Sequence, residues 1–242
     1  MIQLIVYDLD GTLIDSKQDI AEAVNWTLDE LGLVGGHGRT PLSMERISSF
    51  VGNGVTSLMR QVLEEVGTPR AVSLPHAIKL FRRRYGEHLL DHTRLYPSVR
   101  KVLEFYRARK QAVITNKPED FSRRILRALG IDSFFFRILG GDSGFPKKPA
   151  PEALVAVLKE AGVSREEAVL VGDSAMDVET GKNAGIQTAA VTYGFGSREE
   201  IEAAQPDFIL EDLGELIGDG SHFPISGPLG HKSETNRTLK HK

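Results

Sequence analysis

The sequence predicts an α/β fold: a doubly wound, mostly parallel sheet that carries an inserted all-helical domain. Two observations support this. From Leu95 onward, short apolar runs rich in β-branched residues alternate with helical patterns, which is typical of strands buried on both faces of a parallel sheet. The first apolar run is instead separated from the others by a long, mainly helical stretch. This order favours right-handed crossovers and an insertion after the first strand.

The elements of the sheet domain follow from apolar runs and the turn residues that bound them. Strands are expected at Leu4–Tyr7, Ala112–Thr115, Arg137–Leu139, Ala168–Val171, Thr188–Thr192 and Phe208–Leu210. Crossover helices are expected at Phe121–Leu129, Pro151–Glu160, Ala175–Ala184 and Arg198–Ala204. The catalytic core would then consist of residues 1–14 and 93–217.

Residues 15–92 are predicted to form the helical insertion. Ser16-Lys17-Gln18-Asp19 has the pattern of a capping box, and apolar residues from Ile20 to Leu31 follow it at helical spacing. Further helices are expected at Val55–Val66 and Leu74–Leu89. Residues 218–242 are polar and lack an apolar period, which predicts a disordered tail. The alternative is an arm packed on the core through Phe223 and Ile225.

The composition excludes several classes of protein. The 242 residues include no cysteine, which excludes disulfide frameworks, thiolate metal sites and cysteine nucleophiles. A net charge of -3 creates no strong field toward nucleic acid or an anionic membrane. The N-terminus lacks the basic flank of a secretory signal, and no stretch of about 18 uncharged apolar residues occurs. We therefore expect a cytoplasmic protein that acts on a small molecule.

The most specific motif is Asp8-Leu9-Asp10-Gly11-Thr12-Leu13, which directly follows the first apolar run. Ligand sites in open α/β sheets lie outside the carboxyl ends of the strands. Side chains two positions apart share one side of an extended chain, so Asp8 and Asp10 can face one pocket. One carboxylate can then attack phosphorus while the other transfers protons. The alternative is that Asp-Gly only provides a turn at the strand end.

Other strand ends carry groups suited to a metal ion and a phosphate. Asp173 ends a later strand, and with Asp8 it offers the carboxylate oxygens that Mg²⁺ prefers. Ser174 and Asp177 can instead form a capping box. Thr115-Asn116-Lys117 ends another strand, and Lys148 precedes a helix.

A hydroxyl, a nearby backbone N–H and an ammonium suit a phosphate dianion, although each of these residues is also ordinary at its position. The balance of charge argues that the groups belong together. Asp8, Asp10 and Asp173 could not accept a dianionic substrate without a divalent cation and a lysine to balance them. Lys148 can provide the second of these positive charges. The sequence therefore predicts one site for Mg²⁺ and a small phosphorylated metabolite.

In order and spacing these motifs resemble those of haloacid dehalogenase superfamily phosphatases, over the chain up to about Ile217. The resemblance implies that Asp8 is the nucleophile and Asp10 the general acid and base. It implies that Thr115 and Lys148 bind phosphate, and that Asp8, Asp173 and the Asp10 carbonyl bind Mg²⁺. An acid two positions after the nucleophile distinguishes phosphatases from dehalogenases and ion-pumping ATPases of the superfamily. The insertion resembles the helical cap of its members.

The insertion also carries Phe50-Val51-Gly52-Asn53-Gly54-Val55, which resembles the cap segment of phosphoglycolate phosphatases. A glycine turn before a helix leaves backbone N–H groups free for a substrate anion, so Gly52, Asn53 and Gly54 are candidate substrate-binding residues. The alternative is a plain turn between helices. A pyrophosphatase, a phosphosugar phosphatase or mutase, and a non-catalytic phosphate-binding module remain alternative functions. The sequence leaves the oligomeric state open.

Overall fold

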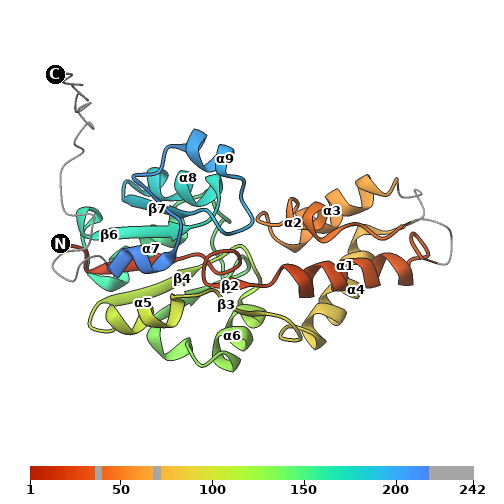
Figure 1. The fold of residues 1–242 in the computed structure, drawn as a ribbon, viewed down its shortest axis with the longest axis horizontal. Coiled ribbons are helices and arrows are strands. Elements are labelled where there is room, and N and C mark those ends of the chain that lie inside the picture. Colours follow the sequence, from red (N-terminus) through yellow and green to blue (C-terminus); the bar gives the residue numbers. More distant parts are fainter. Residues whose placement is uncertain (36–39, 68–71, 218–242) are drawn as a thin grey trace, which may run out of the picture.

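The computed structural model describes residues 1–35, 40–67 and 72–217, so the predicted tail at 218–242 lies outside the described residues. Its centre is a six-stranded parallel sheet in the order β5-β4-β1-β6-β7-β8. The strands are β1 (Leu4–Tyr7), β4 (Lys110–Ile114), β5 (Arg137–Leu139), β6 (Ala168–Gly172), β7 (Gln187–Val191) and β8 (Phe208–Leu210). The predicted doubly wound sheet is confirmed, with β1 paired to β4 and β6 (Figure 1).

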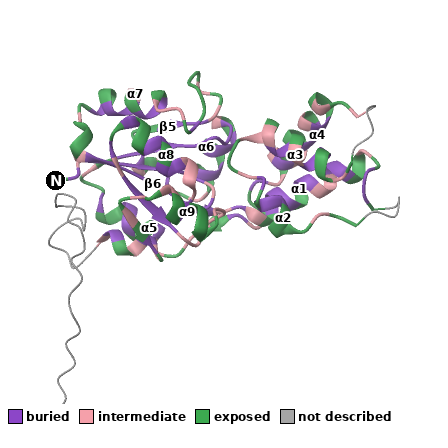
Figure 2. Ribbon diagram, turned by 90° about the horizontal axis from the view of Figure 1, so that it is seen from above, coloured by how far each residue is buried: buried purple, intermediate pink, exposed green. Residues whose placement is uncertain are grey.

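Helices cover both faces of the sheet, which is why its strands are apolar along their length. The helices of this domain are α5 (Val99–Phe105), α6 (Glu119–Ala128), α7 (Glu152–Ala161), α8 (Ala175–Ala184) and α9 (Arg198–Ala204). In β1, Leu4 and Val6 pack in the cluster that contains α7 residues. Ile5 and Tyr7 point the other way, into the cluster with α5 and α6. Figure 2 shows the buried strands and the exposed outer faces of the helices.

Several boundaries differ from the sequence prediction for local reasons. Strand β4 begins at Lys110 because the buried Gln111 continues the strand, accepting a hydrogen bond from the Tyr7 hydroxyl. Helix α6 begins before its apolar pattern, since the acidic residues Glu119 and Asp120 occupy its first turn and complement the helix dipole. Helix α5 was not predicted, because seven residues are too few to establish an apolar period.

The described residues of the inserted segment form four helices beside the sheet domain (Figure 1). They are α1 (Lys17–Glu30), α2 (Met44–Ser48), α3 (Val55–Glu65) and α4 (Leu74–Glu87). Residues such as Val24, Leu28 and Met59 are fully buried between these helices. The short helix α2 was not predicted. In the described part of the chain, every helix is too short or too polar to cross a membrane.

A short two-stranded antiparallel sheet joins the helical insertion to the sheet domain. Strands β2 (Ile14–Asp15) and β3 (Arg94–Leu95) are antiparallel and lie where the chain leaves and re-enters the core. The capping box predicted at Ser16 is wrong, because no side chain caps α1. The buried Asp19 carboxylate instead accepts hydrogen bonds from the His92 and Thr93 backbone N–H groups and from the Thr93 hydroxyl. Asp19 therefore connects the outgoing and returning segments.

We expect replacement of Asp19 by Ala to lower the free energy of unfolding by roughly 1–3 kcal/mol, because the Thr93 donors lose their buried acceptor. Thermal unfolding followed by circular dichroism should show a melting temperature several degrees below that of the parent protein. The control is Glu30→Ala, an exposed acidic residue at the end of the same helix. Equal, small losses in both variants would contradict a connecting role for Asp19.

Candidate active site

The predicted site residues come together at the carboxyl edge of the sheet. Asp8 directly follows β1, Thr115 follows β4, and Asp173 follows β6, so neighbouring strands deliver all three. A cavity of about 470 Å³ lies between this edge and the helical insertion. Its lining includes each predicted catalytic, metal and substrate residue, namely Asp8, Asp10, Gly52, Asn53, Gly54, Thr115, Asn116, Lys148 and Asp173.

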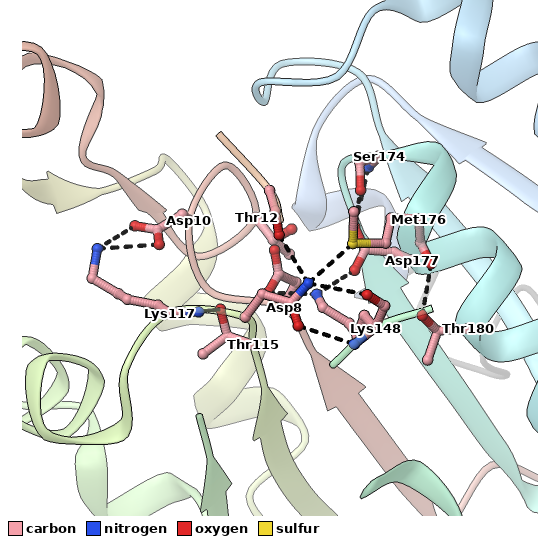
Figure 3. A network of polar contacts seen from close by, with 12 residues as sticks. Asp8, Asp10, Thr12, Thr115, Lys117, Lys148, Ser174, Met176, Asp177 and Thr180 are labelled. Atoms are coloured by element: carbon pink, nitrogen blue, oxygen red, sulfur yellow. Dashed lines mark hydrogen bonds and ion pairs between the residues drawn. The ribbon is translucent and has the colours of Figure 1, made fainter. Parts of the chain in front are cut away.

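Lys148 is the cation at the centre of this edge. Its buried ammonium lies 2.7 Å from Asp8 Oδ1 and donates to Asp177 Oδ1 at 2.5 Å (Figure 3). Although burial lowers the pKa of Lys148, the Asp177 and Asp8 carboxylates raise it above its ordinary value. Lys148 is therefore held charged between the two carboxylates. The alternative of a capping box at Ser174 is confirmed, since Asp177 Oδ2 accepts hydrogen bonds from the Ser174 backbone N–H and hydroxyl.

The Asp173 carboxylate is enclosed on several sides. Thr12 Oγ1 donates to Asp173 Oδ1 at 3.2 Å, and the Phe195 backbone N–H donates to Asp173 Oδ2 at 2.7 Å. Two glycines approach it so closely that a Cβ on Gly11 would lie 2.0 Å from Asp173 Oδ2, and one on Gly194 would lie 2.3 Å from it. Only glycine fits at these two positions, so the backbone itself holds the carboxylate in place.

The carboxylates at this edge fit a divalent cation. Ligand oxygens of Asp8, Asp173 and Asp177 lie within 4.8 Å of one another. Burial raises the pKa of Asp8 to about 6, against the opposing effect of Lys148, and burial and the other carboxylates raise the pKa of Asp173 to about 8. Asp8 Oδ1 is buried and has the Lys148 ammonium, at 2.7 Å, as its partner. One ammonium does not balance three buried carboxylates, and an added cation would offset the remaining negative charge.

The Asp10 side chain lies apart from the carboxylate cluster. Its carboxylate is not one of the three clustered carboxylates and turns toward Lys117 instead (Figure 3). Lys117 Nζ donates to Asp10 Oδ1 at 2.9 Å and to Oδ2 at 3.1 Å, and Ser16 Oγ donates to Oδ1. Lys117 also donates to the Tyr85 hydroxyl, on α4, at 2.5 Å. A role for the Asp10 backbone carbonyl at the metal stays a prediction.

Sequence reasoning did not single out Lys117 or Tyr85. Lys117 follows Thr115 and Asn116 in the same motif, so its place in that motif was an available signal. Tyr85 had no such signal, because only the packing of α4 brings it to the cavity. Asp10 and Tyr85 raise the pKa of Lys117, outweighing the effect of its burial. Burial raises the pKa of the Tyr85 hydroxyl to about 12, so it stays protonated near neutral pH.

The Asn116 side chain is fully engaged within the protein. Its Oδ1 accepts from the Lys148 backbone N–H, while Nδ2 donates to the carbonyl oxygens of Gly52 and Lys148. These bonds fix the loop that carries Lys148 and connect it to the helical insertion. The amide therefore acts on the positions of other groups, and contact of Asn116 with substrate stays a prediction.

The predicted glycine turn precedes helix α3, as expected from the sequence. Gly52 and Gly54 have φ values of 126° and 81°, and α3 begins at Val55. A Cβ on Gly54 would lie 2.5 Å from Lys147 Nζ and 3.0 Å from the Asn116 carbonyl oxygen, so the turn is packed against the sheet domain. Binding of a substrate anion by the amides of this turn stays a prediction.

Comparison with known proteins agrees with this arrangement. Residues 5–191 match the family of haloacid dehalogenase-like hydrolases. The chain belongs to this family. It is 40% identical to a phosphoglycolate phosphatase of Pseudomonas putida over 232 residues, which cover 93% of this chain and 82% of that protein. It is 35% identical to a phosphoglycolate phosphatase of Aquifex aeolicus, with 89% of this chain and 95% of that protein covered.

Solved structures agree with the family assignment. A predicted phosphoglycolate phosphatase from Haemophilus somnus superposes with a TM-score of 0.82 at 30% identity, covering 89% of this chain and 96% of that one. This haloacid dehalogenase-like hydrolase is thus a phosphoric monoester hydrolase, as the resemblance of its motifs implied.

We expect Mg²⁺ to raise the melting temperature of the protein and EDTA to reverse the change, because the cation offsets repulsion among buried carboxylates. Replacing Asp173 by Asn should abolish this increase and leave the metal-free melting temperature within a few degrees of the parent value. The matched control is Glu199→Gln, which removes an exposed carboxylate of α9. An undiminished response to Mg²⁺ in the Asp173 variant would contradict metal binding at this edge.

Proposed function

We propose that this hydrolase is a Mg²⁺-dependent phosphatase that cleaves a small phosphomonoester through an aspartyl-phosphate intermediate. The observation that carries the proposal is the environment of Asp8. This carboxylate follows the central strand, lies 2.7 Å from Lys148 and shares a cavity with Asp10 and Asp173. It combines a nucleophile, a fixed cation and a second acidic group in one enclosed site.

In the first step, an Asp8 carboxylate oxygen attacks phosphorus. A bond forms between that oxygen and phosphorus while the bond from phosphorus to the ester oxygen breaks. The leaving oxygen takes a proton from the Asp10 carboxyl group. Lys148 and the Thr115 hydroxyl hold the phosphoryl oxygens during this transfer, and the Lys148 charge offsets the negative charge that develops on them.

In the second step, water attacks the phosphorus of the aspartyl phosphate. Asp10, now ionised, accepts a proton from the water, and the bond between phosphorus and the Asp8 oxygen breaks. Inorganic phosphate leaves, and Asp8 is again a carboxylate while Asp10 is again protonated. The helical insertion limits the access of bulk water to the cavity during the reaction.

The residues that would hold Mg²⁺ are Asp8, Asp173 and the Asp10 carbonyl. When bound, the ion would neutralise the phosphoryl oxygens as a Lewis acid. Asp177 also belongs to the carboxylate cluster, but both of its oxygens are already engaged by Lys148 and Ser174. We assign Asp177 the role of holding Lys148 in position.

The substrate that we favour is 2-phosphoglycolate. Similar proteins from Pseudomonas putida and Aquifex aeolicus carry the name phosphoglycolate phosphatase. The turn at Gly52, Asn53 and Gly54 lines the same cavity as the catalytic aspartates and can offer amides to a second anionic group. Residues 15–92 would then form a cap over the substrate, and residues 1–14 with 93–217 the catalytic core. A cytoplasmic location stays a prediction from the sequence.

Replacing Asp8 by Asn should abolish turnover of an aryl phosphate, because an amide is not a competent nucleophile. The parent protein should hydrolyse this compound with Mg²⁺ and lose activity in EDTA. Release of the phenol, followed by absorbance, measures both effects. Appreciable Mg²⁺-dependent activity in the Asp8→Asn protein would contradict the covalent mechanism. Inactivity of the parent under both conditions would instead favour a non-catalytic phosphate-binding module.

Among small phosphate compounds, 2-phosphoglycolate should have the highest kcat/KM. Ethyl phosphate lacks the carboxylate, so its kcat/KM should be lower. The decrease should correspond to roughly 1.5–3 kcal/mol, which is the contribution of a charge-assisted hydrogen bond. The measurement is phosphate release from 2-phosphoglycolate, ethyl phosphate, pyrophosphate and a hexose phosphate at one Mg²⁺ concentration. A tenfold advantage for pyrophosphate would favour a pyrophosphatase, and the same advantage for the sugar would favour a phosphosugar enzyme.

A further inference from the structure

The cavity has two positive charges in the part of its lining that the structure describes, Lys117 and Lys148. Lys148 lies between Asp8 and Asp177 and belongs to the phosphoryl site. Lys117 lies beside Asp10, at the boundary between the sheet domain and the helical insertion (Figure 3). It is the cation available to a substrate group that lies away from phosphorus, and the proposed mechanism assigns it no role.

The ammonium of Lys117 has a complete set of acceptors. Its three N–H groups face the two oxygens of Asp10, at 2.9 and 3.1 Å, and the Tyr85 hydroxyl at 2.5 Å. The side chains of Lys117 and Asp10 are only 5% and 11% exposed, so solvent competes weakly with this pair. A new ligand can reach Lys117 only by displacing one of these acceptors, and the Asp10 carboxylate is the anionic one.

The surroundings of Lys117 make it a suitable place for a carboxylate. The ammonium lies 4.6 Å from the centre of the Tyr85 ring, and Phe81 stacks on that ring while Phe121 packs edge-on against it. A carboxylate in such apolar surroundings requires a cation partner, because burying it alone is costly. Exchanging one carboxylate for another on Lys117 leaves the number of buried charge pairs unchanged.

We propose that Lys117 is a specificity-determining residue that binds the carboxylate of the substrate in place of Asp10. This inference rests on the proposed function. The exchange releases the Asp10 carboxylate, which takes a proton from water and can then protonate the leaving oxygen, as the mechanism needs. The Tyr85 hydroxyl stays on Lys117 and keeps the helical insertion in contact with the ammonium during the exchange.

The exchange couples recognition to catalysis. A substrate that carries a carboxylate displaces Asp10 and so brings the general acid into use, whereas a substrate without one leaves Asp10 bound to Lys117. Discrimination then appears in the transition state as well as in binding. A purely structural Lys117–Asp10 ion pair would instead affect all phosphate esters alike.

Binding of two non-hydrolysable analogues tests the exchange directly. 3-Phosphonopropionate is the methylene analogue of 2-phosphoglycolate, and propylphosphonate is the matched analogue without a carboxylate. Replacing Asp10 by Asn removes the competing carboxylate with little change of shape. Isothermal titration calorimetry gives the Kd of each analogue for both proteins. The ratio of the Kd for propylphosphonate to the Kd for 3-phosphonopropionate should be about tenfold or more higher in Asp10→Asn than in the parent protein. An equal change for both analogues, or a relative loss for 3-phosphonopropionate, would overturn the proposal.

Kinetics of Lys117→Gln provide a second test, with Lys147→Gln as the control. Lys147 is the exposed neighbour of Lys148, and its Nζ lies 3.5 Å from the Asn53 carbonyl oxygen. Its replacement by Gln removes one positive charge near the insertion and leaves the contacts of Asp10 unchanged. The preference for 2-phosphoglycolate over ethyl phosphate, as a ratio of kcat/KM, should fall by about 10- to 100-fold in Lys117→Gln. It should stay within about threefold in Lys147→Gln. Equal losses on both substrates in Lys117→Gln would overturn the proposal.

The two tests separate this inference from the proposed function. If the parent protein shows no preference for 2-phosphoglycolate over ethyl phosphate, the proposed substrate and the exchange both fail. If the preference exists and survives in Lys117→Gln, the exchange alone fails. Should Lys117→Gln not fold, as judged by circular dichroism, the analogue titration of Asp10→Asn decides the question by itself.

Discussion

The active site depends on one buried ammonium group. Asp8, Asp173 and Asp177 are all buried within 4.8 Å of one another, and their mutual repulsion would oppose folding without a nearby positive charge. Lys148 provides that charge through contacts to two of the three carboxylates. Because Asp8 directly follows β1 and Asp177 lies on α8, the ammonium also fixes the spacing between the end of the first strand and a helix far along the chain. The same charge is suited to hold a phosphoryl group.

Three consecutive residues after β4 have different roles in the site. Thr115 faces the cavity, Asn116 joins the Lys148 loop to the Gly52 carbonyl, and Lys117 joins Asp10 to Tyr85. Two of the three therefore reach the helical insertion. Movement of the insertion relative to the sheet would change the surroundings of both Lys148 and Asp10, so the position of the insertion and the geometry of the catalytic groups are physically coupled.

The elements that could be predicted are those with a long enough pattern. Strands buried on both faces appear as apolar runs, and helices such as Ala175–Ala184 combine an apolar face with a capping box, so local sequence specifies them. The antiparallel pair at Ile14 and Leu95 has only two residues on each strand, which are too few to show an alternating apolar pattern. Ser16 and Asp19 matched a capping box in sequence. In the structure the Asp19 carboxylate instead accepts hydrogen bonds from the buried N–H and hydroxyl of Thr93.

The sequence by itself determined the fold class, the helical insertion and the chemical groups of the site. These follow from patterns within short segments and from motifs at the ends of apolar runs. Only the tertiary structure decided which carboxylate pairs with which cation. Lys148 pairs with Asp8 and Asp177, whereas Asp10 pairs with Lys117, 107 residues away along the chain. Such pairs depend on distances of a few ångströms between separate segments, and those distances are set by the packing of the whole chain.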